Sequence, residues 1–129
     1  MIDYSLIIAK KSTDIDKSII DPWSGNHAVS GLLLGMLGSS NIITFFLAIL
    51  WEIIENSQLG KILWSFLGWY HYEGDTTINI ISDIMFVIYF SQISKKNNNI
   101  KSISLIFFCL IYHKCYDLLL EYLDITKFN

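Results

Sequence analysis

The chain has 129 residues, of which 53% are apolar and only 16% are charged, and its formal net charge is −3. Soluble domains carry about 25% charged residues, so this composition argues against an ordinary soluble protein. Nine lysines and no arginine offer no basic surface of the kind that nucleic acid requires, which excludes nucleic acid as an expected partner.

The N-terminal segment, residues 1–21, holds three lysines and four aspartates before the only proline, Pro22. We expect an interfacial or exposed arm here, with a short helix over Ile2–Ala9. Residues 22–125 would then form a helical transmembrane domain.

A stretch without Asp, Glu, Lys or Arg follows, from Pro22 to Trp51. A single helix over residues 24–57 would be about 51 Å long, whereas the hydrocarbon core of a bilayer is ~30 Å thick. The run Gly38-Ser39-Ser40-Asn41 is a strong turn signal. We therefore predict a hairpin of two helices, over residues 23–37 and 41–57.

The next segment, residues 59–75, is rich in aromatic residues of the kind that gather at membrane surfaces: Trp64, Trp69, Tyr70 and Tyr72. We expect an interfacial or re-entrant segment here. Two more helices are predicted over residues 76–94 and 100–123, separated by a polar loop. The whole pattern predicts an all-α, multi-pass membrane protein, a bundle of about four short transmembrane helices.

The antiparallel order of these helices predicts that the polar residues meet in one leaflet, because alternate helix ends return to the same side. Ionisable groups at membrane depth are costly, so they tend to face partners or water. His113, Asp117 and Glu121 also stack at intervals of four residues, which is equally typical of an interfacial stripe. The candidate site residues of this leaflet are His27, Glu52, Glu55, Asn56, Asp75, Asn79, Asp83 and Asp117.

Glycines share a face of the first helix with His27, at positions 31, 35 and 38. Gly31 and Gly35 form a GxxxG step, which lets another helix approach closely. The imidazole is therefore predicted to face the bundle and not lipid.

Three segments, PWSGNHAVSGLLLGML, WEIIENS and YHYEGDTTINIISDIMF, carry a resemblance to a family of small bacterial integral membrane proteins of unknown function. More distantly, the layout is similar to the teicoplanin-resistance type of membrane protein. The family has His-Gly where this chain has Ser30-Gly31, and only Asp117 of the last helix corresponds to one of its acidic positions. The positions that match the family pattern are His27, Trp51, Glu52, Glu55, Asn56, Ser57, Gly74, Asp75, Asn79 and Asp83.

These residues suggest a metal-dependent enzyme acting on a lipid headgroup or a lipid-linked phosphate. Nitrogen and oxygen ligands suit one divalent ion, Zn, Mn or Fe(II). In this hypothesis His27, Glu52 and Asp83 hold the metal. Glu55 is then the general base and Asn79 positions the substrate. Asn56, Asp75 and Asp117 form a polar network around the substrate or within the structure.

Two other functions fit the same residues. A crowded acidic cluster could bind a proton, a cation or a cationic headgroup. Alternatively, the network could fix helix register in a homo-oligomer or in a subunit of a larger membrane assembly. Single residues also have simpler explanations, since Glu52 could reach the interface, Glu55 and Asn56 could cap a helix, and His27 could be structural.

Overall fold

The computed structural model describes residues 6–67 and 72–125, and within them the chain is all-α. Its elements are a short 3₁₀ turn, η2 (Ser12–Asp14), and five helices: α1 (Ser24–Met36), α2 (Asn41–Glu55), α3 (Gln58–Phe66), α4 (Thr77–Lys96) and α5 (Asn99–Ile125). The four predicted helices are confirmed with ends within two residues. The aromatic segment, where no helix was specified, contains α3.

Side-chain caps explain where the helices begin. Ser40, Ser57 and Thr76 each accept a hydrogen bond from a backbone N–H in the first turn of α2, α3 and α4. The predicted turn between α1 and α2 is confirmed, and Gly38 takes a φ of +73° there, which glycine adopts without steric cost.

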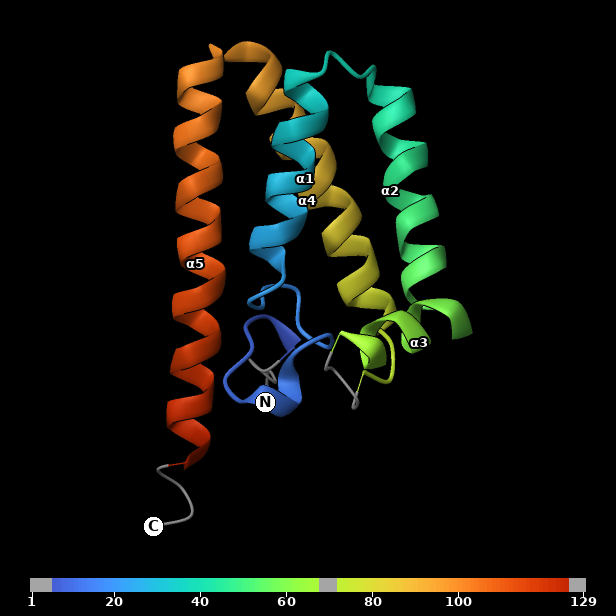
Figure 1. The fold of residues 1–129 in the computed structure, drawn as a ribbon, viewed down its shortest axis with the longest axis vertical. Helices are drawn as coiled ribbons and strands as arrows, with labels where there is room; N and C mark the ends of the chain where they lie inside the picture. Colours follow the sequence, from blue (N-terminus) through green and yellow to red (C-terminus); the bar gives the residue numbers. More distant parts are fainter. Residues whose placement is uncertain (1–5, 68–71, 126–129) are drawn as a thin grey trace.

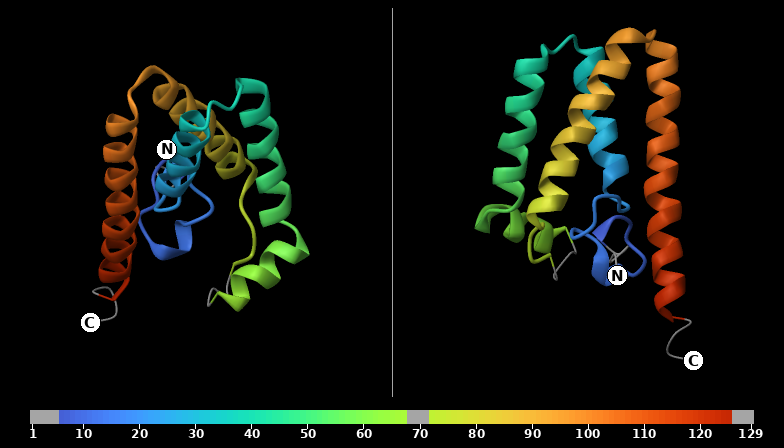
Figure 2. Two further views of the ribbon diagram at one scale, coloured as in Figure 1. Left: turned by 45° about the horizontal axis from the view of Figure 1, so that its top comes forward. Right: turned by 180° about the vertical axis from the view of Figure 1, so that it is seen from behind.

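The centre of the bundle is the contact of α1 with α4. A side chain at Gly31 would overlap the backbone carbonyl of Val87, and one at Gly35 would overlap that of Ser91. The two glycines therefore allow the close approach predicted from their spacing. In Figures 1 and 2, α5 flanks α1 on one side of this pair and α2 flanks α4 on the other.

Many apolar side chains are exposed and many polar ones are buried, which is the reverse of the distribution in a soluble protein. Many large apolar residues of α2 and α5 are exposed, among them Ile42, Phe46, Phe107 and Phe108. The buried residues include many with hydroxyl groups, such as Thr44, Ser91 and Ser102. Small polar residues between helices and apolar residues outside are typical of helices packed in lipid.

Two helices, α4 and α5, are long and apolar enough to cross a membrane. The pair α2 and α3 passes the same test together but bends by 74° at its break, so it is either a broken span or a re-entrant segment. With 13 residues, α1 is only ~20 Å long. Two or three spanning helices are thus supported among the described residues, instead of the four predicted.

The N-terminal arm folds back against the end of the bundle where α1 and α4 begin (Figure 1). Its backbone carbonyls accept hydrogen bonds from Thr76 N, Asn79 Nδ2 and Tyr116 Oη. Ser18 and Asp21 are completely buried, so the arm is not exposed along its whole length. Leu6 has 3₁₀-helical backbone, but the expected helix over Ile2–Ala9 does not continue through Ile7–Ala9, where Ile8 pairs with Ile20 in an isolated β-bridge; residues 2–5 lie outside the described range.

Candidate functional site

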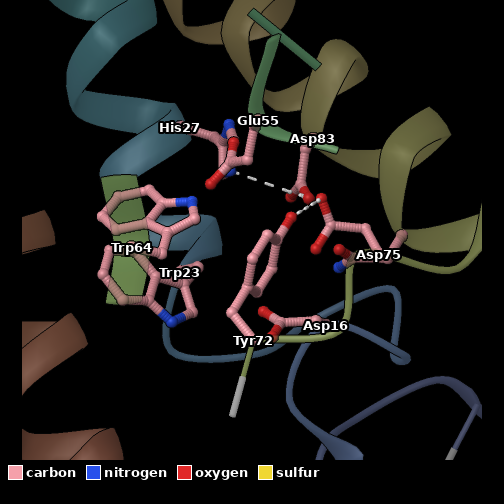
Figure 3. A pocket seen from close by; sticks show the side chains of 9 residues that line it. Asp16, Trp23, His27, Glu55, Trp64, Tyr72, Asp75 and Asp83 are labelled. Carbon is pink, nitrogen blue, oxygen red and sulfur yellow. Dashed lines mark hydrogen bonds and ion pairs between the residues drawn. The ribbon is translucent and has the colours of Figure 1, made fainter. Parts of the chain in front are cut away.

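Three helices bring acidic residues around one imidazole at the arm end of the bundle. His27 lies in the first turn of α1, Glu52 and Glu55 in the last turn of α2, and Asp83 two turns into α4. One ligand atom each from His27, Glu52 and Glu55 lies within 4.8 Å of the others. We call these four residues the acidic cluster; Figure 3 shows His27, Glu55 and Asp83.

Both ring nitrogens of His27 face a carboxylate. Nδ1 lies 3.8 Å from Oε1 of Glu52, and Nε2 lies 3.7 Å from Oδ2 of Asp83. These distances are too long for hydrogen bonds. Two ligands about 2.1 Å from a tetrahedral zinc ion would be ~3.4 Å apart, so a small shift would close either pair around a metal ion.

Burial makes the ionised forms of these side chains energetically unfavourable. His27 is 9% exposed, Glu52 4% and Asp83 2%. The predicted inward direction of His27 is confirmed, and Glu52 is buried between helices as well. Glu52 Oε2, Glu55 Oε2 and Asp83 Oδ1 are buried without a hydrogen-bond partner. An unpaired buried carboxylate is expensive, so these oxygens need a proton or a cation.

A second polar group joins the end of α2 to the start of α4. Asn56 donates from Nδ2 to Oδ2 of Asp75 at 2.8 Å and accepts from the backbone N–H of Asp75 at 2.6 Å. Tyr72 donates its hydroxyl proton to the same Oδ2 at 2.9 Å. Burial raises the pKa of Asp75, and these hydrogen bonds oppose that rise. Asn56 and Asp75 therefore belong to one hydrogen-bonded network.

Asp117 lies apart from this network. It pairs with Lys114 on the surface of α5, with 3.9 Å between the charged atoms, and no described interaction joins it to the acidic cluster. Asn79 lines the same cavity as His27, but its amide group donates to the carbonyl of Ser18 at 2.8 Å. In this geometry Asn79 holds the arm in place.

The arm adds two aspartates that sequence reasoning missed. Asp16 lines the cavity. Asp21, in the same arm, is completely buried. Burial, followed by the charges of Asp75, Asp21 and Glu55, raises the pKa of Asp16 to about 8. Burial also raises the pKa of Asp21. The only sequence signal was the presence of four aspartates just before the uncharged stretch.

Aromatic rings line the cavity beside the cluster. The rings of Trp23 and Trp64 lie together with centroids 5.7 Å apart, and Tyr72 lies 6.2 Å from Trp64 (Figure 3). Trp64 and Tyr72 therefore line the site as well as belonging to the predicted aromatic segment. Trp69 and Tyr70 lie outside the described residues. The cavity among these rings and the acidic residues measures only about 20 Å³, roughly enough for one water molecule.

Comparison of the chain with family models, curated proteins and solved structures found no match.

Proposed function

We propose that the chain is a multi-pass membrane protein whose acidic cluster binds one divalent metal ion and acts on a phosphate-bearing headgroup of a membrane lipid. The exposed apolar faces of α2 and α5 support the membrane location. The resemblance to small bacterial membrane proteins of unknown function is part of this proposal.

The observation that carries the proposal is the set of three buried, unpartnered carboxylate oxygens around a single histidine. Three carboxylates and one imidazole in low dielectric have excess negative charge unless protons or a metal cation neutralise them. A mixed nitrogen and oxygen ligand set suits Zn, Mn or Fe(II). The metal site is therefore the arrangement that satisfies the most orphaned groups at once.

The geometry favours different roles from those predicted for two residues. Glu55, expected as a general base, lies within the group of possible ligand atoms with His27 and Glu52. Asp83, expected as a ligand, faces the other ring nitrogen of His27. A carboxylate on the far nitrogen of a ligating histidine fixes the ring orientation and raises its basicity. In the refined proposal His27, Glu52 and Glu55 hold the metal and Asp83 orients His27.

A bound divalent ion would polarise a phosphoryl oxygen or activate water. The residues around it would exclude bulk water and position the headgroup. Trp23 and Trp64 close the outer side, and Tyr72 is held toward the site by Asp75. The small size of the closed cavity supports an alternative function, the binding of a proton or a bare cation without catalysis.

Elemental analysis of the detergent-purified protein tests the proposal. We expect about one transition-metal ion per chain in the wild type and at least a fivefold loss in Glu52→Gln, with the fold retained. Asp117→Asn is the matched control, because it removes a carboxylate that lies outside the cluster. A wild type without metal would refute the metal site and leave proton binding, and equal metal content in Glu52→Gln would refute the ligand assignment.

A further inference from the structure

A second cavity, of about 300 Å³, lies between α1, α2 and α4. Leu33 and Leu34 form one wall, Leu47 and Ala48 form the opposite wall, and Val87 of α4 contributes the floor. Val87 reaches this position because Gly31 has no side chain to hold α1 away from it. We call this cavity the lateral groove.

The lateral groove is apolar along its length and polar at one end. His27 and Glu52 line that end, and His27 also lines the small cavity of the acidic cluster. The imidazole therefore separates an apolar compartment from an acidic one. An amphiphile, with a hydrocarbon chain and a polar head, matches this division.

We propose that the lateral groove holds one hydrocarbon chain of the lipid substrate, so that its phosphate-bearing headgroup reaches His27 and Glu52 from within the membrane. This inference rests on the proposed function and names the route by which its substrate enters. It also excludes a water-soluble phosphate compound as the main ligand.

Dimensions and exposure support lateral entry. The groove follows α1 from His27 to Leu34, a rise of ~10 Å, so it covers about a third of a hydrocarbon core. Its rim is open to the surroundings, since Leu33, Leu47 and Trp51 are all exposed. From the opposite side, the arm and the Trp23–Trp64 pair leave a space of only about 20 Å³, against about 300 Å³ in the groove.

Ser30 offers a way to fill the groove without disturbing the core. It is exposed, lines the groove and donates its hydroxyl proton to the carbonyl of Asn26 four residues earlier. Ser104 on α5 is also exposed and makes the same kind of bond to Ile100 but does not line the groove. Ser30→Phe and Ser104→Phe therefore add equal bulk to equivalent helix positions inside and outside the groove.

The experiment reconstitutes both variants and the wild type in vesicles containing phosphatidylglycerol with a photoactivatable diazirine in one acyl chain. Cross-linked residues are mapped by mass spectrometry, and metal content is measured on the same preparations. We expect labelling of Leu33, Leu34 or Leu47 in the wild type and Ser104→Phe, and at least a fivefold loss in Ser30→Phe. Metal content should be unchanged in all three. Unlabelled phosphatidylglycerol should compete, and glycerol 3-phosphate should not.

The outcomes separate this inference from the proposed function. Metal without groove labelling would overturn the inference and leave the metal site standing. Groove labelling without metal would refute the proposed function while confirming that a lipid chain occupies the groove. Competition by glycerol 3-phosphate would overturn lateral entry. If Ser30→Phe instead converts a dimer to a monomer and labelling is absent throughout, a second copy of the chain occupies the groove and the inference is wrong.

Discussion

Two polar regions of the same bundle differ in how their polar atoms are satisfied. Toward the α1–α2 turn, hydroxyl groups meet between helices: Thr44 lies 3.4 Å from Ser91, and Ser94 lies 3.1 Å from Ser102. We call this region the hydroxyl interface. Each of these hydroxyls has a partner and none carries charge. At the arm end, the acidic cluster has three buried oxygens without one.

The difference separates a packing device from a binding site. Hydroxyl groups can both donate and accept, so a pair of them satisfies itself in an apolar environment. Ionised carboxylates only accept, and a cluster of them cannot satisfy itself. The hydroxyl interface is therefore complete without a ligand, whereas the acidic cluster requires a proton or a cation. The predictions below test this contrast by changing each region separately.

The largest expected effect is on stability, from Gly31→Ala on the face that supports both regions. The new Cβ would overlap the Val87 carbonyl, which belongs to helix backbone and cannot turn aside. We expect a loss of about 3 kcal/mol or failure to form the bundle, since overpacking outweighs the ~1 kcal/mol gain in helix propensity. Thermal unfolding, monitored by fluorescence-detected size-exclusion chromatography, measures this loss of stability. Ser30→Ala, at the exposed neighbouring position, should be nearly neutral, and equal stability of the two variants would contradict the close contact.

The second-largest expected effect is a gain in stability, and its size depends on pH. Asp16→Asn removes a carboxylate whose pKa is raised from 3.8 to about 8 by burial and by Asp75, Asp21 and Glu55, against the smaller effect of Lys17. The unfolded chain ionises near pH 3.8 and the folded protein near pH 8, so the wild type loses stability as pH rises between these values. Asparagine tolerates the positive φ of 64° at this position.

Unfolding in the presence of EDTA, from pH 4 to pH 9, measures this difference. The variant should nearly equal the wild type at pH 4 and exceed it by about 1–2 kcal/mol above pH 8, a value reduced because Asp16 is partly exposed to solvent. Asp117→Asn, at the surface ion pair of α5, should show no such rise. A variant less stable than the wild type at pH 8 would mean that ionised Asp16 is stabilised by a partner.

The sequence predicted the helices and the convergence of the cluster because both depend on local pattern. The absence of charge from Pro22 to Trp51, the turn at Gly38 and the alternation of helix direction place His27 opposite Glu52 without knowledge of any contact. The glycine spacing predicted the α1–α4 approach for the same reason. These features could be predicted because helix period and connection length are properties of short segments.

Features that depend on long-range packing could not be predicted in this way. Backbone carbonyls of the arm accept hydrogen bonds from Thr76 and Asn79, and these bonds hold the arm against the cluster. Because every residue has a backbone carbonyl, the sequence does not indicate which of them accept such bonds. Ligand geometry was equally inaccessible, because Glu55 and Asp83 differ only in which side of His27 they face. Asp117 was grouped with the cluster by helix direction and by the family resemblance, and neither specifies how α5 is rotated.

The smallest expected effect concerns the hydroxyl interface. Ser94 and Ser102 join α4 to α5 close to their connecting loop, and either hydroxyl can donate to the other. A double-mutant cycle of Ser94→Ala and Ser102→Ala should give a coupling of ~0.6 kcal/mol, the usual value for hydrogen bonds between membrane helices. Metal content should not change, because the pair lies at the opposite end of α4 from Asp83. A loss of metal in either variant would show that the hydroxyl interface sets the geometry of the acidic cluster, and the two regions would then have to be treated as one.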